Sequence, residues 1–115
     1  MVLWRMFVKI LAGWGYCMKF EWDKEKNISN IRKHRVSFED AETVFKDDNL
    51  IIMFDDVHST YEERFNAIGE DLIHRRLLVC HCYRSDNDEE DIIRIISARI
   101  ANKNETRIYE RGLGL

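Results

Sequence analysis

A chain of 115 residues, 45% of them hydrophobic and 34% charged, is long enough for one hydrophobic core and too short for two. Its formal net charge of -3 excludes a protein that binds nucleic acid through overall charge alone. The charge is uneven, because residues 37–63 hold nine acidic side chains and one basic, whereas residues 19–36 hold six basic and three acidic. The folded protein can therefore present one basic and one acidic face.

The first 17 residues differ from the rest in being almost entirely apolar and aromatic. A signal peptide and an interfacial helix are alternatives, but Lys9 interrupts the apolar run and no Ala-x-Ala site follows. We expect Met18 to be the natural start, residues 1–17 to be an extension outside the fold, and residues 18–115 to form a single domain.

The cysteines indicate a reduced compartment. Cys80 and Cys82 are two residues apart, and no second pair completes a zinc site, so small apolar core residues are the favoured interpretation of these thiols. No segment approaches the length of a transmembrane helix. We expect a cytoplasmic protein with no metal, no cofactor and no membrane contact.

The first elements are a short strand over residues 19–22 and a polar helix over residues 24–34, capped by Asp23. Ile28 and Ile31 lie three residues apart on that helix and are expected to be buried. The following segment begins like a capping box, and its apolar residues recur at helical spacing, which predicts a helix whose core positions are Phe38, Ala41, Val44 and Phe45.

The second half of the chain is dominated by strands. Strands are predicted over residues 50–54, 62–68, 77–83 and 92–99, with a turn at residues 69–71 and an acidic loop over residues 84–91. Asn102 and Glu105 resemble a cap that opens a final helix, which Gly112 would end. The order β-α-α-β-β-β-β-α predicts an α+β fold, a mostly antiparallel sheet with packed helices.

Two arginines stand within the isoleucine-rich strand over residues 92–99. Guanidinium groups are rarely buried unless they are paired, so Arg94 and Arg99 suggest a charged surface on a rigid sheet that binds phosphate. Their odd spacing sends them to opposite faces of a regular strand, and a bulge would be needed to bring them together.

His81 is the most ambiguous residue in the chain. Alternation places it with Leu77, Val79 and Tyr83, where a single histidine is more often a hydrogen-bonded core residue than a catalyst. If His81 converged with Arg64 and Arg99, the group could cleave RNA without a metal. The histidine would move protons and the arginines would hold phosphate, assisted by Lys33 and Tyr109.

Several short strings occur together and in order. They are Phe20-Glu21-Trp22-Asp23, Arg32-Lys33-His34-x-Val36-Ser37-Phe38-Glu39, His58-Ser59-x-x-Glu62-Glu63-Arg64-Phe65 and Ile93-Arg94-Ile95-Ile96-Ser97-Ala98-Arg99. With these strings, residues 18–112 resemble the BrnT family of type II toxins, which share a RelE-like fold.

This resemblance implies a ribonuclease toxin, an RNA endonuclease that inhibits translation. It also implies a DNA-binding antitoxin, BrnA, that neutralises the toxin, so that the protein would meet DNA only through this partner. Carried over to this sequence, the catalytic candidates are Arg64, His81, Arg99 and Tyr109, and the RNA-binding candidates are Lys33, His34 and Arg94. Two alternatives are a weakly active subunit that serves mainly as antitoxin partner and corepressor, and a nucleic-acid-binding domain without catalysis.

Three features depart from the family pattern. Arg35 stands where the family usually has glycine, which is the easy residue for a left-handed helix end. The acidic loop over residues 86–91 is longer and more negative than the resemblance leads us to expect, and the first 17 residues have no counterpart.

Overall fold

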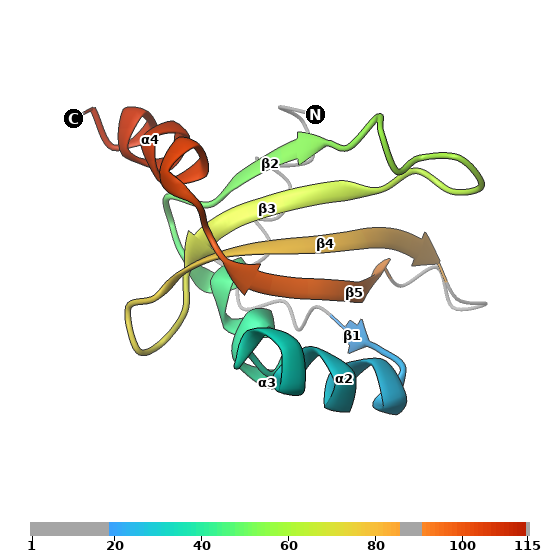
Figure 1. Ribbon diagram of the computed structural model, residues 1–115. Coiled ribbons are helices and arrows are strands. Elements are labelled where there is room, and N and C mark those ends of the chain that lie inside the picture. The colour runs from blue at the N-terminus through green and yellow to red at the C-terminus, as the bar shows by residue number, and fades with distance from the viewer. Residues whose placement is uncertain (1–18, 86–90, 115) are drawn as a thin grey trace.

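A computed structural model describes residues 19–85 and 91–114 of the chain. The predicted N-terminal extension and the acidic residues 86–90 lie outside this part. Five strands form one sheet in the order β1-β5-β4-β3-β2, with bounds β1 Lys19–Glu21, β2 Ile51–Phe54, β3 Phe65–Glu70, β4 Arg76–Ser85 and β5 Asp91–Ile100 (Figure 1). β1 runs parallel to β5 and the other three pairs are antiparallel, so the expected mixed α+β fold with a mostly antiparallel sheet is confirmed.

The helices lie on both faces of this sheet (Figure 1). One face carries α2 (Lys24–His34), α3 (Phe38–Glu42) and a 3-10 turn η1 (Thr43–Lys46), so the predicted single second helix is divided in two. The main core lies under α3 and η1, where the four predicted helix positions meet inward side chains of β3, β4 and β5. The other face is covered at one end by α4 (Lys103–Gly112), which packs Tyr109 against Ile68 and Leu78. We call these surfaces the helix face and the α4 face.

Helix α2 buries asparagines, and the prediction that Ile28 and Ile31 are buried is wrong: they are 52% and 41% exposed. Asn30 accepts a hydrogen bond from the Ala98 amide at 3.1 Å and donates to the Ala98 carbonyl at 2.7 Å. The reason is that β1 pairs with β5 only as far as Arg94, so the edge of β5 beyond it needs polar partners.

A β-bulge interrupts β5. On β4, Cys80 lies opposite Ser97 and the next residue, His81, lies opposite Ile95, which leaves Ile96 without a partner in the register. One extra residue on one strand shifts the alternation of side chains by one position.

The bulge decides where the two arginines of β5 point. Ile93 and Ile95 precede it and Ala98 follows it, yet all three belong to the main core. Their neighbours Arg94 and Arg99 therefore both lie on the α4 face. Regular alternation predicted opposite faces, and the alternative, a bulge that brings the two arginines to one face, is the arrangement found.

Two helix ends depart from simple sequence rules. Arg35 ends α2 in the left-handed conformation, with φ 59°, which is the strained arrangement suggested by its place where glycine is usual. Helix α4 ends at Gly112, as predicted, but Gly112 is its last helical residue and Leu113 is the cap. A Cβ atom on Gly112 would lie 2.9 Å from Ile51 Cδ1, so a side chain at this position would require the Ile51 side chain to shift.

Candidate active site

His81, a predicted catalytic residue, is a core residue in the structure. It is fully buried on the helix face between the rings of Phe45, Phe65 and Tyr83. Its Nδ1 lies 3.2 Å from the Val79 carbonyl oxygen and its Nε2 lies 3.0 Å from the Tyr83 hydroxyl. Burial lowers the pKa of His81 to about 4, so the imidazole is neutral near pH 7.

Tyr109 and Arg99 attach α4 to the sheet. Tyr109 is buried, donates a hydrogen bond from its hydroxyl to Asp47 Oδ2 at 2.6 Å and packs its ring 5.1 Å from the Arg76 guanidinium. Burial and the Asp47 contact raise the pKa of Tyr109. Arg99 donates to both carboxylate oxygens of Glu105 at 2.8 Å. These contacts account for both residues as anchors of the helix.

Arg64, His81 and Arg99 do not converge in one cleft. His81 lies on the helix face, whereas Arg99 lies on the α4 face opposite Leu78. Phe65 lies opposite His81, so Arg64, the residue before it, lies near Cys82. Cys82 is four residues from Leu78 along β4. That separation is about 13 Å along a strand.

The structure instead brings Arg64 and Arg94 together across the α4 face. Arg94 lies opposite Cys82 in the register, and the charges of Arg64 and Arg94 both act on the Cys82 thiol. Arg94 also forms an ion pair with Glu21 at 3.0 Å. Burial nevertheless raises the pKa of Cys82, and that of Cys80 to about 11, so neither thiol is a ready nucleophile.

A histidine–aspartate pair that was not predicted from the sequence lies beside Arg64. Asp55 directly follows β2, is 9% exposed, and its Oδ2 lies 2.8 Å from His58 Nδ1. Burial opposes ionisation of Asp55, but hydrogen bonds from the His58 side chain and backbone and from the Asn66 side chain outweigh it and lower the pKa of the carboxyl. The Asp-x-x-His spacing after a strand was the available signal.

His58 is oriented by this contact and remains accessible. Its side chain is 63% exposed, and with Nδ1 on the carboxylate, Nε2 is left for another partner. A backbone frame holds the pair, since the Asp55 amide donates to the Arg64 carbonyl at 2.8 Å and the Arg64 amide donates to Ser59 Oγ at 2.9 Å.

His58 and Arg64 line one hollow of about 250 Å³, together with Val57, Thr60, Tyr61 and Glu62. Arg64 Nε is buried and has no hydrogen-bond acceptor within the described ranges, and it lies 3.6 Å from Glu62 Oε1. An oriented imidazole and an arginine side chain therefore line the same hollow. This pairing can move a proton and bind an oxyanion.

The remaining predicted RNA-binding residues lie at the edge of the sheet. Lys33 and His34 line a groove of about 200 Å³ between α2 and β5, whose other lining residues include Ile96 and Ser97. Ser97 lies opposite Cys80 on the α4 face, and the charge of Arg64 acts on the Cys80 thiol. The groove therefore borders the surface that carries Arg64 and Arg94.

Across residues 19–85 and 91–114, no group of three or more His, Cys, Asp or Glu side chains could hold a metal ion. Within the same ranges, no helix has the length and apolar character needed to cross a bilayer.

Comparisons with known proteins agree with this fold. A family model described as the ribonuclease toxin BrnT of type II toxin–antitoxin systems matches residues 22–105. The 1.1 Å crystal structure of the Brucella abortus ribonuclease toxin BrnT matches with a TM-score of 0.57 and 26% sequence identity. That match covers 76% of this chain and 100% of the Brucella chain. A comparison with curated protein sequences finds no match.

Proposed function

The chain belongs to the BrnT family of ribonuclease toxins of type II toxin–antitoxin systems, and on that premise we propose that it cleaves RNA endonucleolytically at the hollow lined by His58 and Arg64. The observation that carries the assignment of residues is the orientation of His58 by Asp55 in a hollow that the Arg64 side chain also lines. This replaces His81 and Tyr109 as proton carriers, since both are buried in the cores.

In the proposed reaction, His58 Nε2 takes the proton of a ribose 2′-hydroxyl as its oxygen attacks the adjacent phosphorus. The new bond from the 2′-oxygen to phosphorus forms while the bond from phosphorus to the 5′-oxygen breaks. The proton returns to the leaving 5′-oxygen, which gives a cyclic phosphate and a 5′-hydroxyl. Asp55 stabilises the imidazolium formed on the way, and Arg64 stabilises the charge on the phosphate oxygens.

Substrate binding in this proposal extends across the α4 face. Arg94 binds a second phosphate, and Lys33 and His34 bind the chain where it crosses the edge of β5. Tyr61 is 101% exposed and lines the hollow, so an unpaired base can stack on its ring.

We also propose the finer properties that the family resemblance implies. These are a RelE-like fold, a reaction that needs no metal ion, inhibition of translation in the cytoplasm, and neutralisation by a DNA-binding, BrnA-like antitoxin. Under this proposal the toxin meets DNA only through the antitoxin.

The test compares purified wild-type protein with His58→Asn, Arg64→Gln and the control His74→Asn on a single-stranded RNA. His74 is another exposed histidine, 86% by its side chain, on the turn between β3 and β4. We expect the two site variants to cleave RNA about 100- to 10,000-fold more slowly and the control to match the wild type. Cleavage that continues in EDTA supports the metal-free mechanism, and loss of cleavage restored by added metal contradicts it.

Full cleavage by His58→Asn would show that the proton carrier has been assigned to the wrong residue. A wild-type protein that leaves RNA intact and is harmless on induction would contradict the enzyme proposal. That result would favour a subunit that acts mainly as antitoxin partner and corepressor.

A further inference from the structure

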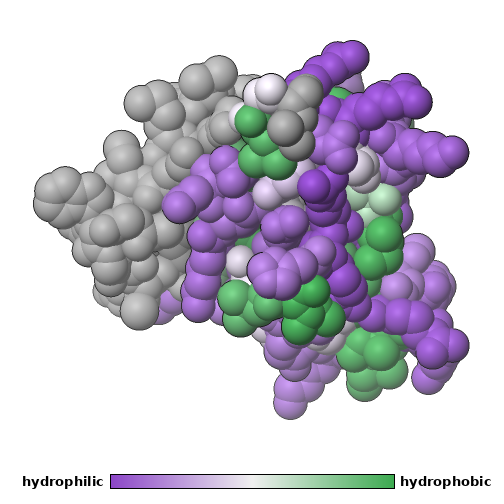
Figure 2. Space-filling view, turned by 90° about the vertical axis from the view of Figure 1, so that its left-hand side faces the viewer, coloured by the Kyte–Doolittle hydropathy of each residue, from purple (hydrophilic) through white to green (hydrophobic). Residues whose placement is uncertain are grey.

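The turn between β3 and β4 presents two large aliphatic side chains to solvent. Leu72 and Ile73 are 71% and 66% exposed. Figure 1 shows this turn at the end of the sheet, and Figure 2 shows that side of the molecule, where hydrophobic patches stand out among hydrophilic side chains. A pair of adjacent exposed aliphatic residues at a turn tip contributes nothing to the cores.

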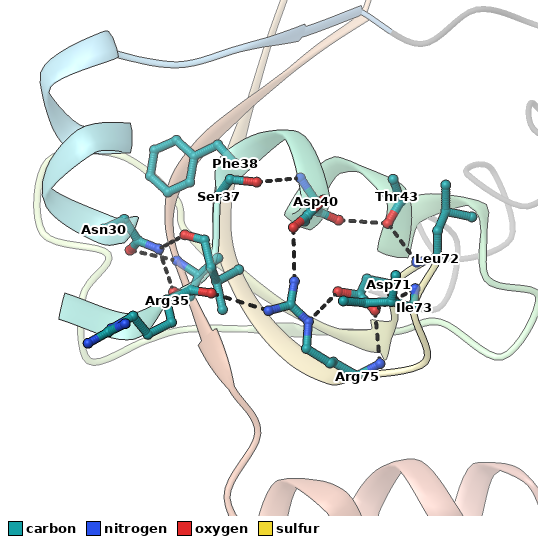
Figure 3. A network of polar contacts seen from close by, with 12 residues as sticks. Asn30, Arg35, Ser37, Phe38, Asp40, Thr43, Asp71, Leu72, Ile73 and Arg75 are labelled. Carbon is teal, nitrogen blue, oxygen red and sulfur yellow. Dashed lines mark hydrogen bonds and ion pairs between the residues drawn. The ribbon is translucent and has the colours of Figure 1, made fainter. Parts of the chain in front are cut away.

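A buried carboxylate holds the turn in one conformation (Figure 3). The side chain of Asp71 is 1% exposed, and its Oδ1 accepts the backbone amides of Ile73 at 3.1 Å and Arg75 at 2.8 Å. Its Oδ2 accepts Arg75 Nε at 2.8 Å. The backbone of the turn is therefore closed by hydrogen bonds that do not involve the exposed side chains.

Arg75 and Thr43 then fix the turn to the helix face (Figure 3). The Arg75 guanidinium donates to Asp40 Oδ2 at 3.0 Å and to the Arg35 carbonyl at 3.2 Å. The Leu72 amide donates to Thr43 Oγ1 at 3.2 Å. Because the tip is already ordered, a partner that covers it loses little conformational entropy of this chain.

The surroundings of the turn carry a net negative charge, although Arg75 of the turn pairs with Asp40 and Asp71. Thr43 and Asp40 belong to a segment, residues 38–48, that holds five acidic side chains and one basic. Glu70 precedes the turn, and its amide donates to Asp47 Oδ2 at 2.8 Å. An occupant of this surface must bring apolar side chains and positive charge together.

We propose that this turn is the docking site for a segment of the cognate antitoxin that carries aliphatic side chains flanked by lysine or arginine. The choice of a basic segment rests on the proposed function, in which the antitoxin binds DNA. RNA does not fit, because the acidic surroundings repel phosphate. A second copy paired symmetrically would bring two acidic surfaces together.

The chain offers a matched control on another surface. Ile28 and Ile31 on α2 are also exposed, but Arg32 and Arg35 lie one turn from them on the same helix, so that patch has the opposite charge. The double variants Leu72→Ser/Ile73→Ser and Ile28→Ser/Ile31→Ser therefore each replace two exposed aliphatic side chains by serine, one pair at an acidic site and the other at a basic site.

The experiment measures the affinity of each full-length variant for the antitoxin encoded by the reading frame beside the toxin gene, by calorimetry. We expect the turn variant to bind about 100-fold more weakly and the α2 variant to bind like the wild type. Thermal unfolding and RNA cleavage should be unchanged in the turn variant. A variant that removes two acidic charges near the turn, Glu42→Gln/Glu70→Gln, should bind the antitoxin more weakly. Its affinity should also depend less on salt concentration.

Wild-type affinity in the turn variant, or loss of affinity only in the α2 variant, would overturn the docking site. These results are separable from those on function, because binding is measured without RNA. A wild-type protein that binds the antitoxin tightly but cuts no RNA would refute the ribonuclease mechanism and leave the docking site standing.

Discussion

Replacing Asn30 by leucine tests whether a single side-chain amide satisfies the backbone hydrogen-bonding groups at the edge of β5. Leucine has a similar volume, so the substitution removes hydrogen bonds without leaving a large cavity. Three bonds are lost: from the Ala98 amide at 3.1 Å, to the Ala98 carbonyl at 2.7 Å and to the Val36 carbonyl at 2.8 Å. All three backbone groups belong to buried residues.

At about 1 kcal/mol for each bond, Asn30→Leu should lower the free energy of unfolding by about 3 kcal/mol. For a domain of this size the midpoint of thermal unfolding should fall by roughly 10–20 °C. Urea unfolding followed by circular dichroism measures the change, and Asn104→Leu, on the exposed first turn of α4, serves as the control. A decrease in the free energy of unfolding below about 1 kcal/mol would show that water or a shift of α2 satisfies the backbone groups at this edge, and would refute this account.

Two further predictions concern strain and pH. Arg35→Gly should raise the free energy of unfolding by about 1 kcal/mol, because glycine adopts the φ of 59° without a steric cost, whereas Arg32→Gly within α2 should lower it by a similar amount. Equal effects in urea unfolding would argue against strain at Arg35. The pKa of His81 falls from 6.5 to about 4 on folding, so the unfolded chain binds the proton more tightly. Stability should therefore be complete above pH 6.5 and should fall by about 3 kcal/mol as the pH drops to about 4. His81→Gln should remove most of this dependence, and an unchanged pH profile in that variant would contradict the assignment.

Local sequence signals predicted the helices and strands, and their order along the chain, where the structure depends on residues that are close in sequence. Asn102 and Glu105 form the capping box read from the sequence, and Ser37 accepts the Asp40 amide. The apolar spacing in residues 38–45 identified four core positions. Alternation also placed His81 on the side of Leu77 and Val79, where the structure has it, but its full burial argues against the catalytic role predicted for it from the family resemblance.

Predictions were wrong where the environment of a residue is set by a segment that is distant in sequence. The two isoleucines of α2 satisfy the rule for an apolar helix face, but the helix lies against a strand edge that needs hydrogen bonds, so asparagines are buried instead. Helix propensity depends on the helix sequence alone and does not include this neighbouring strand.

The candidate site shows the same division. The sequence alone identified the family resemblance, the sheet and the arginines that lie on it, because these depend on residue type and short spacing. It could not select among the histidines, since accessibility depends on which face of the sheet each occupies and what covers it. Only the tertiary structure placed His81 in the core and His58 on Asp55. Only the bulge at Ile96 brought Arg94 and Arg99 to one face, because register is set by pairing with β4 and not by the strand itself.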